Sequence, residues 1–244
     1  MQRRIDGRQA DQLRPLTITA GVNPAAEGSC EISMGNTRIW IAASVEDRVP
    51  PFLKGSGQGW ITAEYGMLPR SGRQRSQREV NRGAPGGRTH EIQRLIGRSL
   101  RSVVDLEKLG EKTITLDCDV IMADGGTRTA AITGAFVALT EAFRWMIDQG
   151  YLSKFPFQER LAAVSVGVIG GQEYLDLCYE EDSKAGVDMN VVMTDQGRFV
   201  EIQSTAEGNP FTLERFNRLL EVAKNGCQKI FEVQSSIIDE LMRA

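Results

Sequence analysis

One stretch restricts the fold of this chain more than any other, because two different periodicities meet at residues 123–136, ADGGTRTAAITGAF. Residues 113–122, just before it, alternate between apolar and polar side chains, as a strand does. After the two glycines, apolar residues recur at helical spacing, among them Ile132, Phe136 and Leu139. We therefore expect a strand to turn into a helix at this glycine pair.

The expected turn suits an oxyanion. Its two glycines let backbone amides approach a ligand without interference from a Cβ atom. A helix N-terminus presents free N–H groups and the positive end of the helix dipole. Thr127 adds a hydroxyl, and Arg128 adds a forked cation that matches phosphate geometry. We expect phosphate to bind at Gly126, Thr127 and Arg128, although a capped helix start with a solvated arginine would have the same local sequence.

Positive charge is concentrated in residues 70–101. This segment holds nine arginines, two glutamates and no lysine, so its net charge is +7, whereas the whole chain carries −3. Arginine without lysine indicates bidentate phosphate recognition or pairing at an interface, and a basic patch on an acidic protein attracts a polyanion. A solvated surface is the alternative. The polar and glycine-rich part up to residue 87 is expected to be a mobile loop.

A second helix is predicted from residue 89 onward, with Thr89 as its N-cap. Arg88 would then stand just before another helix N-terminus, as a second candidate phosphate ligand. His90 is the only histidine, so neither a histidine-based triad nor a histidine-based zinc site can be built, and we expect it to be a polar residue of the first helical turn.

Two carboxylates, Asp182 and Asp188, flank a short glycine-containing turn that leads into a strand. They can hold a divalent metal such as Mg²⁺, which prefers oxygen ligands, or share a proton, or be solvated. The sequence contains no strong general base, and a nucleophile that is already an anion needs none. Inorganic phosphate held by arginines and amides could attack a phosphodiester in line, with a metal on the carboxylates stabilising the departing oxygen.

Composition indicates a cytoplasmic α+β protein with a substantial core. The chain has 244 residues, of which 41% are hydrophobic. Its four cysteines are widely separated, which argues against a disulfide framework or a zinc site and for a reducing compartment. Residues 1–15 are polar and basic, lack the apolar segment of a signal peptide, and are expected to form an extended arm. No uninterrupted apolar run reaches 18 residues, so no membrane partner is expected.

Long motifs of the chain resemble the bacterial ribonuclease PH family, over essentially the whole sequence: RRIDGR, GSCEISMGNTR, GRTHEIQRLIGRSLR, DGGTRTAAITGAF and LDLCYEEDSKAGVDMNVVMT. The resemblance implies a phosphate-dependent 3′-to-5′ exoribonuclease that trims nucleotides beyond the 3′ CCA end of tRNA precursors. Such an enzyme releases nucleoside diphosphates and runs in reverse as a nucleotidyltransferase. A role in ribosomal RNA processing or degradation is implied as well.

The resemblance also assigns site residues. The family's phosphate ligands fall on four positions: Arg88, Gly126, Thr127 and Arg128. Its catalytic acids fall on Asp182 and Asp188, with Asp182 as the proton donor or metal-side acid for the 3′ leaving oxygen, and Arg128 counts as catalytic with them. Inorganic phosphate would be the co-substrate and Mg²⁺ the metal.

Two positions depart from the family pattern. His90 stands where a glutamine is expected, and Gly186 lies in a turn that usually carries a larger residue. Neither departure touches a phosphate ligand, but His90 could tune RNA contact.

The implied fold is the ribonuclease PH fold, which resembles the second domain of ribosomal protein S5, with mixed sheets packed against helices in one domain over residues 1–244. Family members form homohexameric rings, as trimers of dimers. Five arginines are expected to bind RNA or to join subunits: Arg70, Arg73, Arg75, Arg78 and Arg82. Two rival functions remain, a non-catalytic ring subunit that only binds RNA, and a hydrolytic nuclease or another phosphate-using transferase. The intact GGTRT motif and both aspartates speak against the first.

Overall fold

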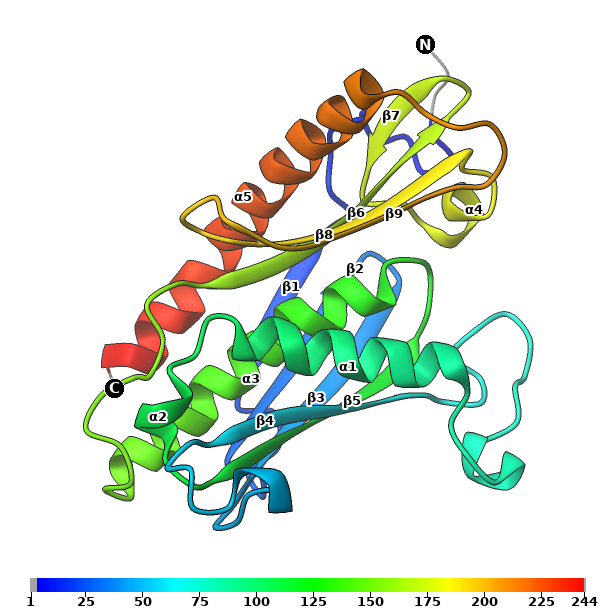
Figure 1. Ribbon diagram of the computed structural model, residues 1–244. Helices are drawn as coiled ribbons and strands as arrows, with labels where there is room; N and C mark the ends of the chain where they lie inside the picture. The colour runs from blue at the N-terminus through cyan, green and yellow to red at the C-terminus, as the bar shows by residue number, and fades with distance from the viewer. Residues whose placement is uncertain (1–3, 244) are drawn as a thin grey trace.

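The computed structural model describes residues 4–243, without the side chains of Val80 and Arg82. The predicted role of the Arg82 side chain therefore lies outside the described part. The chain forms two β-sheets with helices packed against them, which confirms the expected α+β class (Figure 1).

The first sheet has five strands and contains a hairpin that the sequence predicts, because residues 28–34 and 37–45 both read as strands and Gly35-Asn36 between them can supply the positive φ values of a tight turn. Gly35, in the left-handed region at φ +58°, makes the tight turn between β2 and β3. Every pairing is antiparallel except that of β4 with β5, which is parallel. In spatial order the strands are β1 (Leu16–Ala20), β2 (Gly28–Met34), β3 (Thr37–Glu46), β5 (Thr113–Met122) and β4 (Trp60–Met67).

The second sheet is antiparallel and has four strands, in the order β7 (Gln172–Leu175), β6 (Leu161–Ile169), β8 (Val187–Thr194) and β9 (Phe199–Ala206). The sequence pattern predicts a strand over residues 174–179, and that prediction is wrong beyond Leu175. Asp176 adopts φ +53°, which a strand does not allow, and the chain then forms the short helix α4 (Tyr179–Asp182). Asp182 therefore ends a helix, whereas Asp188 lies on strand β8.

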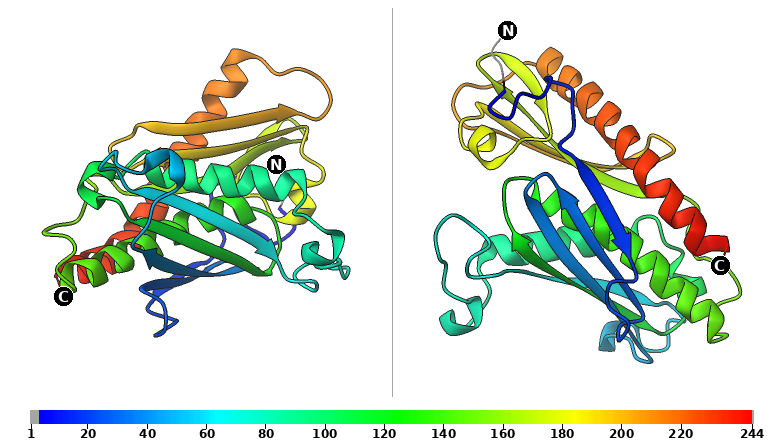
Figure 2. Two further views of the ribbon diagram at one scale, coloured as in Figure 1. Left: turned by 60° about the horizontal axis from the view of Figure 1, so that its bottom comes forward. Right: turned by 180° about the vertical axis from the view of Figure 1, so that it is seen from behind.

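Two helices, α1 (Gly87–Arg101) and α3 (Thr127–Asp148), cover one face of the first sheet, and α5 (Leu213–Arg243) packs against the second (Figures 1 and 2). Helix α3 also contacts the second sheet, where the Ala163 amide donates to Thr133 Oγ1 at 3.1 Å. Within residues 4–243, α3 alone is long and apolar enough to span a membrane, but 78% of that apolar window is buried in the fold. It is a core helix.

The remaining helices are short: α2 (Leu106–Leu109) and the 3₁₀ turns Pro51–Leu53 and Glu79–Arg82. The last of these belongs to the arginine-rich loop, which extends away from the body of the molecule in both views (Figures 1 and 2). Most of loop 70–86 therefore projects from the body (Figure 1), although Glu79 contacts Thr89 at the start of α1.

Candidate active site

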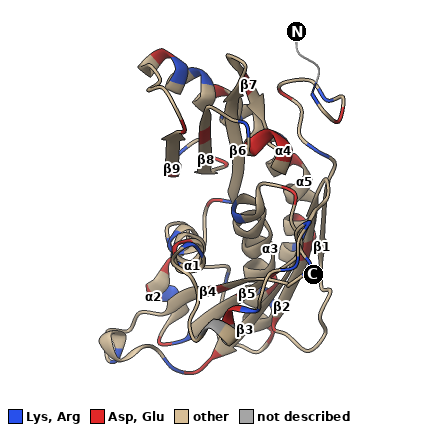
Figure 3. Ribbon diagram, turned by 90° about the vertical axis from the view of Figure 1, so that its right-hand side faces the viewer, with Lys and Arg blue, Asp and Glu red and all other residues tan. Residues whose placement is uncertain are grey.

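A cavity of about 900 Å³ lies where the two sheets face each other, beside the N-terminal ends of α1 and α3. Figure 3 shows the acidic helix α4 across from these helix ends. Segments far apart in the sequence line this cavity, and all six predicted active-site residues are among them: Arg88, Gly126, Thr127, Arg128, Asp182 and Asp188.

The predicted turn from strand to helix is confirmed. Its backbone conformation requires glycine at both positions of the pair. Gly125 and Gly126 have φ +78° and +65°, in the region that favours glycine, and Gly126 is the N-cap of α3. A Cβ on Gly125 would lie 2.5 Å from the carbonyl oxygen of Leu177. The first amides of α3 have no acceptor within the helix and line the cavity, so they present an anion site.

The Thr127 hydroxyl is positioned by a tyrosine. Tyr65, on β4, donates from its hydroxyl to Thr127 Oγ1 at 2.9 Å. Burial raises the pKa of Tyr65, which keeps this donor protonated. Because Thr127 Oγ1 accepts that bond, its own O–H remains available to an anion in the cavity.

The two candidate phosphate arginines both lie in first helical turns. Helix α1 begins at Gly87, so Arg88 lies within the helix. The sequence predicts Thr89 as the N-cap, and that prediction is wrong, because the N-cap is Gly86. The Thr89 hydroxyl donates to Glu79 Oε1 at 2.6 Å instead, because the preceding loop folds back over the helix start.

Arg128 is oriented from two other elements. Its Nη1 donates to Gln203 Oε1 on β9 and lies 3.5 Å from Glu91 Oε1 on α1. Gln203 also donates to Glu91, at 2.8 Å. Sequence reasoning missed both supporting residues, because single polar residues on a strand and on a helix are common surface features.

The acidic pair is partly buried and mutually coupled. Burial raises the pKa of Asp182, while Arg88 and Arg128 act in the opposite direction. Burial, followed by the charge of Asp182, raises the pKa of Asp188 to about 6. Asn190 donates a weak bond to Asp188 at 3.4 Å. Such a pair is stabilised by a proton or by a divalent cation.

Only part of the arginine loop reaches the cavity. Of the four predicted arginines in that loop whose side chains are described, Arg73 lines the cavity and Arg70, Arg75 and Arg78 do not; all four are exposed. The Arg73 guanidinium lies 5.9 Å from the ring of Tyr179, a half-exposed rim residue that the sequence did not single out. His90 is exposed, in the first turn of α1 as predicted, and does not line the cavity.

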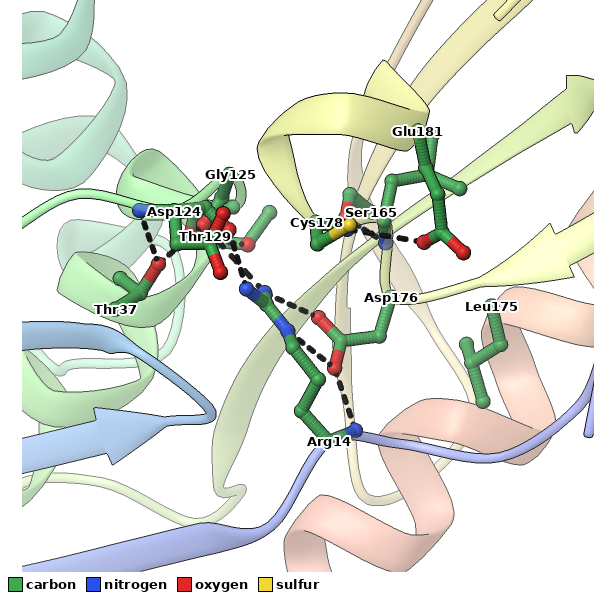
Figure 4. A network of polar contacts seen from close by, with 12 residues as sticks. Arg14, Thr37, Asp124, Gly125, Thr129, Ser165, Leu175, Asp176, Cys178 and Glu181 are labelled. Carbon is green, nitrogen blue, oxygen red and sulfur yellow. Dashed lines mark hydrogen bonds and ion pairs between the residues drawn. The ribbon is translucent and has the colours of Figure 1, made fainter. Parts of the chain in front are cut away.

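The N-terminal segment is not the extended polar arm that the sequence predicts. Arg4 and Arg14 are only 5% and 4% exposed, because each forms a bidentate ion pair with a buried acid of the second half of the chain. Arg4 binds Glu181, and Arg14 binds Asp176 (Figure 4). Arginines in a polar segment usually remain solvated, so the sequence held no signal for this burial.

Two family models match most of the chain, domain 1 of the 3′ exoribonuclease family over residues 12–144 and domain 2 of the same family over residues 160–226. The chain is also 56% identical, over 236 residues, to a protein named ribonuclease PH from Solibacter usitatus (strain Ellin6076). That match covers 97% of this chain and 99% of the relative.

Solved structures show the same fold. An Archaeoglobus fulgidus exosome structure, described as having RNA bound to the active site, superposes with a TM-score of 0.79 at 24% identity, covering 94% of this chain and 92% of that one. Rice Rrp46 superposes with a TM-score of 0.77 at 19% identity, covering 98% and 99%. Together with the sequence matches, these likenesses show that the chain belongs to the 3′ exoribonuclease family, as a relative of bacterial ribonuclease PH.

Proposed function

We propose that the chain trims the nucleotides beyond the 3′ CCA end of tRNA precursors and also acts on ribosomal RNA ends. Its family membership and its 56% identity to a ribonuclease PH make it a phosphorolytic 3′ exoribonuclease and nucleotidyltransferase that uses inorganic phosphate as a substrate. The observation that carries the site assignment is the meeting of two arginines, a glycine loop and two acids at one cavity.

The phosphate ligands of this proposal are Arg88, Gly126, Thr127 and Arg128. The amides at the start of α3 and the free Thr127 O–H donate to phosphate oxygens, and the two guanidinium groups neutralise its charge. Phosphate bound in this way is already a nucleophile, so no base has to remove a proton from it.

The reaction is an in-line displacement. A phosphate oxygen forms a bond to the phosphorus of the 3′-terminal nucleotide, while the bond from that phosphorus to the 3′ oxygen of the preceding nucleotide breaks. A nucleoside diphosphate leaves, and the released 3′ oxygen takes a proton from Asp182, the carboxyl that we assign as donor, to become the new RNA end. The reverse reaction adds a nucleotide and releases phosphate.

A divalent metal fits Asp182 and Asp188. Both are oxygen donors, and their partial burial and mutual repulsion favour a cation beside them. No group of three or more His, Cys, Asp or Glu side chains in the described part of the chain is placed to hold a metal. Mg²⁺ commonly uses one or two carboxylates and takes its other ligands from water and phosphate. Held there, it would stabilise negative charge on the departing oxygen.

We propose a homohexamer, a trimer of dimers, in the cytoplasm. The exposed side chains of Arg70, Arg73, Arg75 and Arg78 on a projecting loop suit either a subunit interface or the RNA backbone. All four cysteines are free and buried, which agrees with a reducing compartment. The single-domain organisation over residues 1–244 is part of the same proposal.

The product of the reaction tests the function. A tRNA precursor with a short 3′ extension is incubated with the protein and Mg²⁺, with and without inorganic phosphate, and the released nucleotides are separated. We expect nucleoside diphosphates only with phosphate, and loss of the extension up to CCA. Nucleoside monophosphates without phosphate would show a hydrolase, and binding without any product would show a non-catalytic RNA-binding subunit.

A further inference from the structure

The glycine loop of the phosphate site is held from behind by the N-terminal segment (Figure 4). Arg14 donates from Nη1 to the carbonyl oxygen of Asp124 and from Nη2 to that of Gly125, at 3.4 Å. The Thr37 hydroxyl donates to the same Gly125 oxygen at 2.6 Å and accepts from the Asp124 amide at 3.0 Å. Both carbonyls of the loop are therefore fixed by side chains from outside it.

This anchoring sets the direction of the loop amides. In a planar trans peptide, the N–H points opposite to the C=O. With the carbonyls of Asp124 and Gly125 turned toward Arg14, the amides of Gly125 and Gly126 point away from it. Both glycines line the cavity and Arg14 does not, so the amides face the cavity side.

A buried acid holds the Arg14 fork in place. Asp176, which is fully buried, accepts from Arg14 Nε at 3.0 Å, from Nη2 at 2.6 Å and from the Arg14 backbone amide at 2.8 Å. The Asp176 carboxylate thereby neutralises the positive charge of Arg14, and neither residue lines the cavity. Arg14 therefore does not act as a further phosphate ligand.

The backbone of Asp176 is itself unusual. Its φ of +53° makes it the sole residue other than glycine with a positive φ in the described part of the chain. The Asp176 amide donates to the Ser165 carbonyl at 2.7 Å, and its carbonyl accepts from Arg4 and Arg8, each at 3.0 Å. Disfavoured backbone of this kind persists where surrounding contacts hold it, commonly next to functional sites.

We infer that Arg14 and Asp176 form a positioning pair that orients the amides of the glycine loop toward inorganic phosphate. This inference rests on the proposed function. Neither residue touches phosphate or RNA; the pair acts through the backbone of Gly125 and Gly126. Its loss should weaken phosphate binding selectively, while RNA binding continues to depend on other parts of the molecule.

The variant that tests this is Arg14→Lys. Lysine keeps the charge, but a single ammonium cannot span Asp176 and both loop carbonyls as the fork does. We expect the KM for inorganic phosphate and its Kd, measured by calorimetry without RNA, to rise by about tenfold or more, the loss expected for a charge-assisted hydrogen bond. The KM for RNA should stay within about twofold, since the proposed RNA contacts are side chains elsewhere.

Arg160→Lys is the matched control. Arg160 is also a partly buried arginine whose fork binds two partners, Ser235 and Asp239, but it does not line the cavity and no contact of it with Asp176 or the loop is found in the described residues. Its phosphate KM should equal that of the wild type. A second variant, Thr37→Val, removes the other anchor of the Gly125 carbonyl while leaving the ion pair intact, and should raise the phosphate Kd by a smaller factor.

The inference is overturned if folded Arg14→Lys binds phosphate as the wild type does, if its RNA and phosphate KM values rise together, or if Arg160→Lys shows the same loss. Should Arg14→Lys fail to fold, Thr37→Val decides, and an unchanged phosphate Kd there overturns the inference. Failure of the proposed function would look different, because the wild type itself would release no nucleoside diphosphate in the presence of phosphate.

Discussion

At the scale of single residues, the site separates charges that face the cavity from charges that hold its walls. Arg128 faces the cavity and is steered by Gln203 and Glu91, whereas Arg4 is buried behind it against Glu181. Arginine serves both purposes because its fork binds phosphate and carboxylate equally well. Mutation of Arg128 should therefore lower activity, whereas breaking the Arg4–Glu181 pair should lower stability.

Arg128→Ala removes a clamp on the nucleophile. We expect phosphorolysis to fall by about 10²–10³-fold, the usual effect of deleting one preorganised donor to developing charge. RNA binding should survive, because most of the RNA charge is met elsewhere. Arg94→Ala is the control, since Arg94 is exposed on α1 and lies outside the cavity lining. Near-normal turnover of Arg128→Ala at low phosphate would refute the assignment.

Asp182→Asn and Asp188→Asn keep the side-chain size and remove the charge. If the pair donates a proton or holds Mg²⁺, turnover should fall by about 10²–10⁴-fold in each variant, with an unchanged circular dichroism spectrum. The response of turnover to added Mg²⁺ should also be lost. Full activity in both variants would show that the pair is only a structural feature of the cavity wall.

Glu181→Gln tests the buried ion pair behind the site. Although burial opposes it, the hydrogen bonds from Arg4 and from the Cys178 amide hold the pKa of Glu181 below its ordinary value of 4.5. A lowered folded pKa stabilises the protein above pH 4.5, and this stabilisation is lost as the pH falls through the folded pKa.

We therefore expect Glu181→Gln to lower the free energy of unfolding by about 3–5 kcal/mol at neutral pH, as for other broken buried pairs. The difference from wild type should shrink below pH 4.5. Glu214→Gln, which breaks an exposed pair with Arg218, should cost less than about 1 kcal/mol. A loss that is independent of pH would show that the Glu181 charge is not what stabilises the fold.

At the scale of elements, the arginine-rich loop is largely separate from the proposed phosphate site. Of its described arginines, Arg73 lines the cavity and Arg70, Arg75 and Arg78 do not. No residue of this loop belongs to a hydrophobic cluster found in the described part of the chain. We propose that its arginines serve a partner, which is RNA, a neighbouring subunit, or both.

Alanine at Arg70, Arg73, Arg75, Arg78 and Arg82 should weaken tRNA binding and flatten its salt dependence. Each lost phosphate contact changes the slope of log affinity against log salt by about 0.7–0.9. Cleavage of a short oligonucleotide should suffer less, because it needs only the cavity.

Light scattering must accompany that measurement, since dissociation of the assembly would also weaken binding. Replacing Arg215 and Arg218 on α5 by alanine is the control for removing arginines from another surface. If both the mass and the salt slope remain those of the wild type, the loop is only a solvated surface.

At the scale of the whole molecule, the two family segments share their packing. Helix α3 lies against both sheets, and Gln234 of α5 donates to the carbonyls of Thr133 and Leu161, at 3.2 and 3.1 Å. Of the three hydrophobic clusters in the described part of the chain, the two large ones lie around α1 and α3 and under α5, and α5 contributes Ile238 to the first. Unfolding of either family segment would therefore expose apolar residues of the other.

We therefore expect the protomer to unfold as one unit. Calorimetry should give a single transition with equal calorimetric and van't Hoff enthalpies, under conditions where the oligomeric state is constant. Binding of phosphate should raise the midpoint of that transition as a whole. Two resolved transitions, with only one shifted by phosphate, would show two independent domains.

The sequence by itself determined the features that depend on neighbouring residues. Alternation and a Gly-Asn pair were enough to predict the hairpin of β2 and β3, and the change of period at Gly125 and Gly126 was enough to predict the turn from strand to helix. The bounds of helices were harder to predict. Thr89 was expected to be the N-cap of α1, but it lies inside that helix and its hydroxyl binds Glu79. Local backbone preferences govern these features, so a short window of sequence contains their cause.

Only the tertiary structure decided which distant groups meet. The packing of two sheets brings Asp182 and Asp188 to the ends of α1 and α3, and no local pattern records that distance. Arg14 and Asp176 are 162 residues apart, yet their ion pair buries the Arg14 charge on a segment that the sequence predicts to be an extended polar arm. A buried charge is stable only beside its partner, and the fold alone supplies that partner.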